Sequence, residues 1–128
     1  YVQYAHARIC SIFRKANSEG ISLPEKPEGL LDRLVLDEEM TLIRTLSGFP
    51  SLLEDISAAL EPHRLTYYLT DLAASFHKYF NLGTKVSEYR IVTEDRTTSR
   101  ARLFLAEGIR IVIASGLELL GISAPERM

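Results

Sequence analysis

The sequence lacks the features that mark membrane, disulfide-rich and metal-binding proteins. It has a single cysteine, Cys10, which excludes an internal disulfide and fits a reducing compartment. No run of about 18 apolar residues is free of charge, so no membrane-spanning helix is predicted. There is no Cys-x-x-Cys pair and no glycine-rich phosphate loop, because Gly108, Gly116 and Gly121 are scattered through or after a predicted helix. These absences favour a cytoplasmic protein without a metal ion.

The remaining composition is that of one globular domain. The 128 residues are 46% hydrophobic and 25% charged, a balance that excludes a disordered tail. A chain of this length forms about one domain, so residues 1–128 are predicted to be a single unit. The first residue is Tyr1 rather than Met, and no signal-peptide pattern is present. We therefore expect the chain to be a piece of a longer polypeptide.

Charge is distributed unevenly along the chain. The net charge is −2 and the isoelectric point is about 5.9, whereas proteins that grip nucleic acid mainly through counterion release are usually basic. Residues 25–61 hold nine acidic and three basic side chains, a net charge of −6, so the rest of the chain carries +4. Any nucleic-acid face therefore belongs to the two ends of the chain. DNA is not an expected partner.

Apolar residues recur every three or four positions, which predicts an all-α helical bundle. Residues 21–35, which include Pro24 and Pro27, are predicted to be an irregular connection. Residues 89–92 could form a short extended piece. About five helices are expected, over residues 1–16, 37–46, 52–60, 62–80 and 98–120.

Local signals predict how these helices begin and end. Gly20 supplies a left-handed turn after the first helix, and the Asp37 carboxylate is expected to cap the second. Thr98 or Ser99 is the expected cap of the last helix. The second helix is expected to bury Met40 among its apolar residues.

Few residues suit catalysis. His6 and Cys10 lie one helical turn apart, the spacing of a thiol–imidazole pair, but nothing supplies an oxyanion hole or an orienting third group. A small buried cysteine is the favoured interpretation. His63 and His77 lie roughly 21 Å apart along one helix, so they cannot share a metal ion. No catalytic residue, metal or cofactor is predicted in this chain.

One flank of the first helix carries a stripe of aromatic and basic side chains. At about 100° per residue, the stripe falls beside the apolar face and not on it. Aromatic rings and guanidinium groups stack on unpaired bases, while cations meet phosphates, so the stripe suits single-stranded RNA. From the spacing alone, a face that packs on a neighbouring domain is the favoured explanation. The stripe consists of Tyr1, Tyr4, Arg8, Ser11 and Lys15.

Residues 76–80, Phe-His-Lys-Tyr-Phe, end the fourth predicted helix. Five consecutive positions cover every side of a helix, so His77 and either Tyr79 or Phe80 can leave the core. They form a stacking platform for bases or a helix end tucked under a loop.

Arginines gather around the start of the last predicted helix. A cation at a helix N-terminus opposes the helix dipole and needs a partner. Phosphate would serve, but Glu94 and Asp95 are the more usual explanation. The arginines are Arg96, Arg100, Arg102 and Arg110.

Three segments resemble the anticodon-binding domain of arginyl-tRNA synthetases, and together they span the chain. Residues 1–8 (YVQYAHAR) resemble its opening helix, residues 72–80 (LAASFHKYF) a later helix, and residues 116–128 (GLELLGISAPERM) its carboxyl end. In place of the Asp-Ala-Leu-Arg sequence that names this domain type, residues 95–100 spell DRTTSR.

The resemblance implies a specific role. Members of the family attach arginine to its tRNA with ATP, in a class I catalytic domain that precedes this region. The His-Ile-Gly-His-like and Lys-Met-Ser-Lys-Ser-like motifs of that domain are absent here, so the resemblance implies that these residues alone cannot aminoacylate. The implied partners are the anticodon stem and loop of an arginine tRNA and the catalytic domain of the same polypeptide. ATP is the cofactor of that catalytic domain alone.

The resemblance also implies which residues meet RNA. Tyr1, Tyr4 and Arg8 match residues that meet the anticodon loop, and Met128 matches a methionine close to the same bases. Phe80 occupies the position of a stacking tyrosine and lacks its hydroxyl donor. A domain of the same type from another class I synthetase and a helical protein-interaction module are the alternatives. The full predicted RNA-binding set is Tyr1, Gln3, Tyr4, Arg8, His77, Phe80, Arg127 and Met128.

Overall fold

The computed structural model describes residues 1–23, 25–26 and 29–128. Within these residues the fold is all-α, as predicted, with five α-helices and two short 3₁₀ turns. The predicted connection at 21–35 is described only in part, because Pro24 and Pro27 lie outside the described residues. None of the described helices combines the length and apolarity needed to cross a membrane. The elements are α1 (Val2–Ser18), η1 (Leu31–Arg33), α2 (Asp37–Ser47), α3 (Phe49–Ala59), α4 (His63–Lys85), η2 (Ser87–Tyr89) and α5 (Arg96–Leu119).

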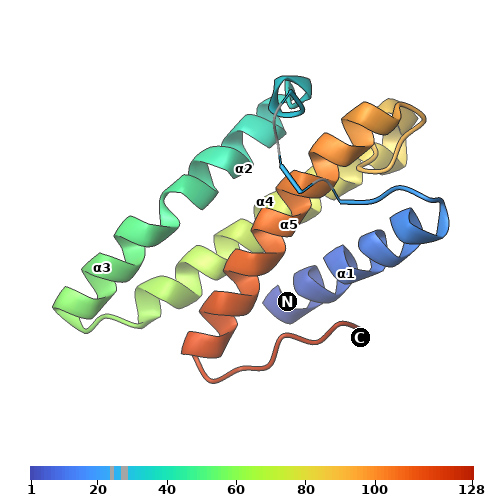
Figure 1. Cartoon of the computed structure of the whole chain (residues 1–128). Helices are drawn as coiled ribbons and strands as arrows, with labels where there is room; N and C mark the ends of the chain where they lie inside the picture. The colour runs from blue at the N-terminus through green and yellow to red at the C-terminus, as the bar shows by residue number, and fades with distance from the viewer. Residues whose placement is uncertain (24, 27–28) are drawn as a thin grey trace.

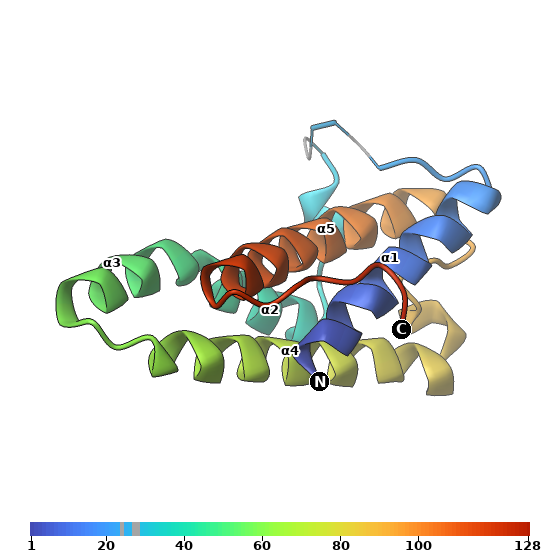
Figure 2. The same ribbon diagram turned by 90° about the horizontal axis from the view of Figure 1, so that it is seen from below.

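The two longest helices, α4 and α5, pack against each other and form the centre of the bundle (Figure 1). Helix α1 packs on both of them, α2 packs on both as well, and α3 follows α2 and contacts α4. After α5 the chain turns back and runs along α1, so segments from opposite ends of the sequence lie side by side (Figure 2). The last two residues of this segment, Arg127 and Met128, line the candidate site described below.

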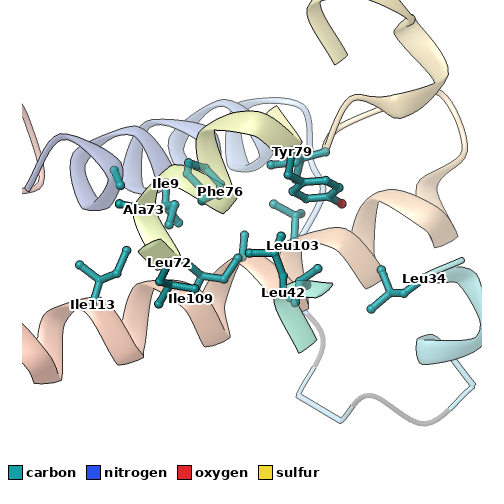
Figure 3. Packing of buried hydrophobic residues seen from close by; sticks show 14 of the residues in the cluster. Ile9, Leu34, Leu42, Leu72, Ala73, Phe76, Tyr79, Leu103, Ile109 and Ile113 are labelled. Carbon is teal, nitrogen blue, oxygen red and sulfur yellow. The ribbon is translucent and has the colours of Figure 1, made fainter. Parts of the chain in front are cut away.

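The core lies where α1, α2, α4 and α5 meet (Figure 3). The apolar stripe of α4 is buried, as the spacing of apolar residues by three and four positions predicts, at Leu65, Leu69, Leu72 and Phe76. Of the two aromatic candidates at the end of that stripe, the fully buried residue is Tyr79. Phe80 is only partly buried, which leaves its ring available at the surface.

The start of α2 differs from the prediction. Asp37 is the first helical residue and not the cap, and the Glu39 carboxylate accepts the Leu36 N–H at 3.0 Å instead. Met40 is 41% exposed, whereas Leu42 is fully buried. The side of α2 that faces the core carries Glu39 and Leu42, because Glu39 forms a buried ion pair that is described below.

The predictions for residues 81–99 are wrong in three places. Helix α4 continues to Lys85. The expected extended piece at 89–92 is absent from the described residues, because Tyr89 ends the η2 turn and irregular backbone follows it. Helix α5 begins at Arg96, because Asp95 accepts hydrogen bonds from the N–H groups of Thr97 and Thr98. A carboxylate at this position also favours the helix dipole, which explains why it displaces Thr98 and Ser99 as the cap. The left-handed turn at Gly20 is confirmed, with φ +76°.

A buried polar network joins α2, α4 and α5. Arg102 Nε donates to Glu39 Oε2 at 2.9 Å, and the Tyr79 hydroxyl donates to the same oxygen at 2.5 Å. Burial, followed by the Glu39 charge, raises the pKa of Tyr79, so its hydroxyl stays protonated as the donor. Arg102 Nη1 also donates to the main-chain oxygens of Glu88 and Arg90, at 2.7 and 2.8 Å. The network therefore ties the segment after α4 to the core.

Gly83 brings that segment close to α4. A Cβ at this position would lie 2.7 Å from Arg90 Cα, so only glycine allows the approach. Arg90 Nε donates to the Gly83 carbonyl at 3.2 Å. Arg90 is thereby held against the end of α4.

Candidate nucleic-acid interface

The predicted stripe on α1 lies on the surface, where it meets the end of α4. The Arg8 guanidinium lies between two rings, with its Cζ 4.9 Å from the centre of Tyr4 and 4.3 Å from the centre of Phe80. Arg8 Nη2 also donates to the Tyr4 hydroxyl at 2.8 Å. Tyr1 is 64% exposed and Tyr4 is 44% exposed, so both rings offer a face to solvent. The structure thus brings residues of the stripe and of the aromatic run into one cluster.

His77 forms the base of this cluster. Its ring centre is 5.3 Å from that of Tyr1 and 5.6 Å from that of Tyr4. Arg8 Nη1 lies 3.4 Å from His77 Nδ1, and because arginine only donates, Nδ1 is the acceptor. Burial, followed by the Arg8 charge, lowers the pKa of His77. His77 is therefore neutral at pH 7 and serves as an aromatic support and not as a cation.

We expect the pKa of His77 to lie below the ordinary histidine value of 6.5. Replacing Arg8 with Gln should raise this pKa without restoring 6.5, because His77 remains buried. The folded protein binds this proton less readily than the unfolded chain does, so stability falls as the pH drops below about 6.5. An NMR titration of the imidazole signals measures both values. An equal His77 pKa in the two proteins would contradict the contact with Arg8.

A groove of about 650 Å³ opens beside the cluster, between α1, the end of α4 and the segment at 90–92. Five cationic side chains line it and no carboxylate side chain does, among the residues that the structure describes. Apolar side chains of Ile12, Ile91 and Val92 line it as well. Its electrostatic potential favours an anion, and its walls accept flat apolar groups. The cations are Arg8, Arg14, Lys15, Arg90 and Arg127.

The two predicted site residues farthest along the chain reach this groove. Arg127 and Met128 line it, although they are separated from α1 by the whole sequence. Gln3 lies differently, because its Nε2 donates to the Ser123 carbonyl at 2.8 Å. Seven of the eight predicted RNA-binding residues therefore lie at the aromatic cluster or the groove, while Gln3 contacts the returning segment.

The His6–Cys10 pair has the geometry of a structural contact. Cys10 Sγ lies 3.8 Å from His6 Nδ1, but the same nitrogen lies 2.8 Å from the Pro125 carbonyl, which can only accept. Burial raises the pKa of Cys10, so the thiol stays protonated. The described residues also include no group of three or more His, Cys, Asp or Glu side chains that could hold a metal ion.

The arginines of α5 have partners other than those predicted. Arg96 donates to the carbonyls of Glu19 and Gly20, Arg100 donates to that of Ser22, and Arg110 pairs with Glu107. Asp95 pairs with Arg33, at 3.1 Å. The expectation that Glu94 and Asp95 pair with the α5 arginines is wrong, because Arg96 and Arg100 donate to main-chain carbonyls, whereas Arg102 pairs with Glu39 and Arg110 with Glu107.

Comparison with known families identifies the fold. A model described as "DALR anticodon binding domain" matches residues 2–128. The chain belongs to the DALR anticodon-binding domain family. This DALR domain is 49% identical over 128 residues to an arginine–tRNA ligase of Geotalea uraniireducens and 46% identical to one of Syntrophotalea carbinolica. Each alignment covers 100% of this chain and 22% of the relative.

A solved structure agrees with these sequence comparisons. The arginyl-tRNA synthetase of Thermus thermophilus is 32% identical, with a TM-score of 0.76, and the match covers 100% of the DALR domain described here and 21% of that chain. The chain therefore spans about a fifth of the length of its relatives. The predicted resemblance to the anticodon-binding domain of arginyl-tRNA synthetases is confirmed.

Proposed function

We propose that this domain binds the anticodon stem and loop of an arginine tRNA, as part of an arginine–tRNA ligase. The observation that carries the proposal is the groove beside the Tyr4–Arg8–Phe80 stack, whose described lining has five cationic side chains and no Asp or Glu side chain. Splayed bases stack on aromatic and guanidinium faces, and their phosphates meet nearby cations. The similarity of the whole chain to about a fifth of an arginine–tRNA ligase supports this assignment.

Each group has a role in this proposal. Tyr1, Tyr4 and Phe80 stack on unpaired bases, and Met128 supplies an apolar contact beside them. Arg8, Lys15 and Arg127 meet the phosphates. The acidic middle of the chain does not oppose binding, because the cations are concentrated at the groove.

The polypeptide that carries this domain is proposed to ligate arginine to its tRNA with ATP, in a cytoplasmic catalytic domain outside these residues. The domain itself binds no cofactor and performs no bond-making step. It holds the anticodon arm so that the distant acceptor end reaches that catalytic domain, which is its second partner.

A titration with two RNAs tests the proposal. The chain is titrated, at fixed low salt, with an arginine tRNA and with the same tRNA carrying a changed middle anticodon base. Tighter binding to the unchanged tRNA is expected. Equal binding would show that only shape and phosphates are recognised. Binding to neither, by a folded chain, would favour the aromatic face as a seam between protein domains.

Replacing Arg8 with Ala is expected to weaken tRNA binding and to reduce its salt dependence. A cation that neutralises one phosphate adds about 0.7 to 0.9 to the slope of log K against log salt concentration. The slope of the variant should therefore be smaller in magnitude by about 0.7 to 0.9. Lys26→Ala, outside the groove lining, is the matched control. Equal slopes for Arg8→Ala and the parent chain would show that Arg8 does not contact a phosphate.

A further inference from the structure

The segment after α5 follows a fixed path along α1. Gly121, with φ +74°, reverses the chain direction after the helix, and the Ile122 N–H donates to the Leu117 carbonyl at 2.8 Å. Residues 122–128, which we call the return segment, then run back along α1 (Figure 2). This segment ends with Arg127 and Met128 at the groove.

Three side chains of α1 hold the return segment by its main-chain oxygens. Gln3 Nε2 donates to Ser123 at 2.8 Å, His6 Nδ1 donates to Pro125 at 2.8 Å, and Arg14 Nη1 donates to Glu126 at 3.1 Å. His6 is only 3% exposed, so its donor is shielded from competing water. Because the acceptors are carbonyl groups, these bonds fix the path of the segment whatever its side chains are.

Two faces of α1 therefore have different tasks: one lines the groove and the other holds the return segment. Tyr4 and Arg8 belong to the aromatic cluster, while Gln3 and His6 face the return segment. An unstructured segment loses conformational entropy when it becomes ordered. This entropy loss weakens RNA binding unless the segment is already ordered before the RNA binds. The contacts with α1 order the segment in the protein without RNA.

We propose that Gln3 and His6 are positioning residues, which hold the return segment against α1 so that Arg127 and Met128 face the bound RNA. This inference rests on the proposed function. It gives Gln3 a different task from the direct RNA contact expected from the sequence. It also gives His6 a role in recognition although it lies beneath the surface.

Methyl NMR measures the position of the segment directly. The chain has two methionines, Met128 in the return segment and Met40 on α2, so methyl-labelled methionine gives two signals and one is an internal control. In Gln3→Leu and His6→Leu the Met128 signal should sharpen and move toward its position in an unfolded chain. The Met40 signal should not move. In His6→Asn the amide nitrogen replaces Nδ1, so the Met128 signal should stay close to that of the parent chain.

Binding of the unchanged arginine tRNA then tests the consequence. Gln3→Leu and His6→Leu should each weaken binding about 3- to 10-fold, and His6→Asn should restore it. In a chain that already carries Arg127→Ala and Met128→Ala, Gln3→Leu should cause no further loss, because the segment has no contact left to position. If Gln3 only stabilised the fold, Gln3→Leu would weaken binding equally with and without Arg127 and Met128.

Four results would overturn the inference. Further loss from Gln3→Leu in the Arg127→Ala, Met128→Ala background would show that Gln3 contacts RNA itself. Unmoved Met128 signals in both leucine variants would show that the hydrogen bonds do not hold the segment. Unchanged binding by both leucine variants, beside weakened binding by Tyr4→Ala, would reject the positioning role and keep the proposed function. If the parent chain binds neither tRNA, the proposed function fails and the inference fails with it.

Discussion

Replacing Arg102 with Met is expected to destabilise the domain by about 3–5 kcal/mol, because it leaves the Glu39 carboxylate uncompensated in the core. Glu39 is 0% exposed and Arg102 is 5% exposed, so water cannot replace the lost partner without opening the structure. The carbonyls of Glu88 and Arg90 lose their donor at the same time. Urea denaturation followed by circular dichroism measures the loss, as a lower midpoint with an unchanged slope.

A triple variant separates the buried charge from the loss of packing. Changing Glu39 and Arg102 to Met and Tyr79 to Phe replaces the whole network with apolar groups, and this should recover part of the lost stability. Recovery is incomplete because the two carbonyls remain without their donor and the Leu36 N–H loses its acceptor, Glu39. A triple variant that is less stable than Arg102→Met alone would show that the charge of Glu39 is not what destabilises the single variant.

The helices could be predicted from the sequence because the spacing of apolar residues fixes which side of each helix faces the core. The stripe on α4 and the apolar face of α1 are examples, and Leu72, Phe76 and Ile9 are all fully buried as that spacing requires. The burial of Met40 was wrongly predicted by the same reasoning. Met40 is one position from Glu39, and apolar spacing alone gives no reason to bury a carboxylate.

The buried network had a signal in the sequence. Glu39 is one helical turn from Leu42 and two turns from Leu46, and Arg102 has the same relation to Leu105 and Ile109. Two opposite charges on two buried stripes indicate an ion pair. The pairing itself depends on how α2 and α5 pack, because these residues lie far apart in the sequence.

The aromatic and basic residues of the candidate site could be picked out from the sequence, but their assembly in space could not. Spacing placed Tyr4 and Arg8 on one flank, and the structure confirms that they are neighbours. The contribution of Arg90 depends on the close approach at Gly83, and that of Arg127 depends on the return segment, so neither follows from periodicity. Contacts between segments that are distant in the sequence leave no pattern in the residues on either side of them, so the spacing of residues does not predict them.

Replacing Tyr4 with Ala is expected to weaken binding of the arginine tRNA by about 1–3 kcal/mol, or roughly 5- to 150-fold, which is the range for loss of one base-stacking ring. Tyr4 also contacts the Arg8 guanidinium through its ring and its hydroxyl, so the substitution frees Arg8 as well. Because Tyr4 is 44% exposed, the fold should change little. The same titration at fixed low salt gives the affinities.

Tyr4→Phe is the matched control, because it keeps the ring and removes only the hydroxyl that accepts from Arg8 Nη2. If stacking dominates, this variant binds within a few-fold of the parent chain while Tyr4→Ala does not. Equal losses in the two variants would mean that the hydroxyl, by orienting Arg8, carries the effect. Unchanged affinity in Tyr4→Ala would remove the ring from the RNA interface and leave the groove cations to account for binding alone.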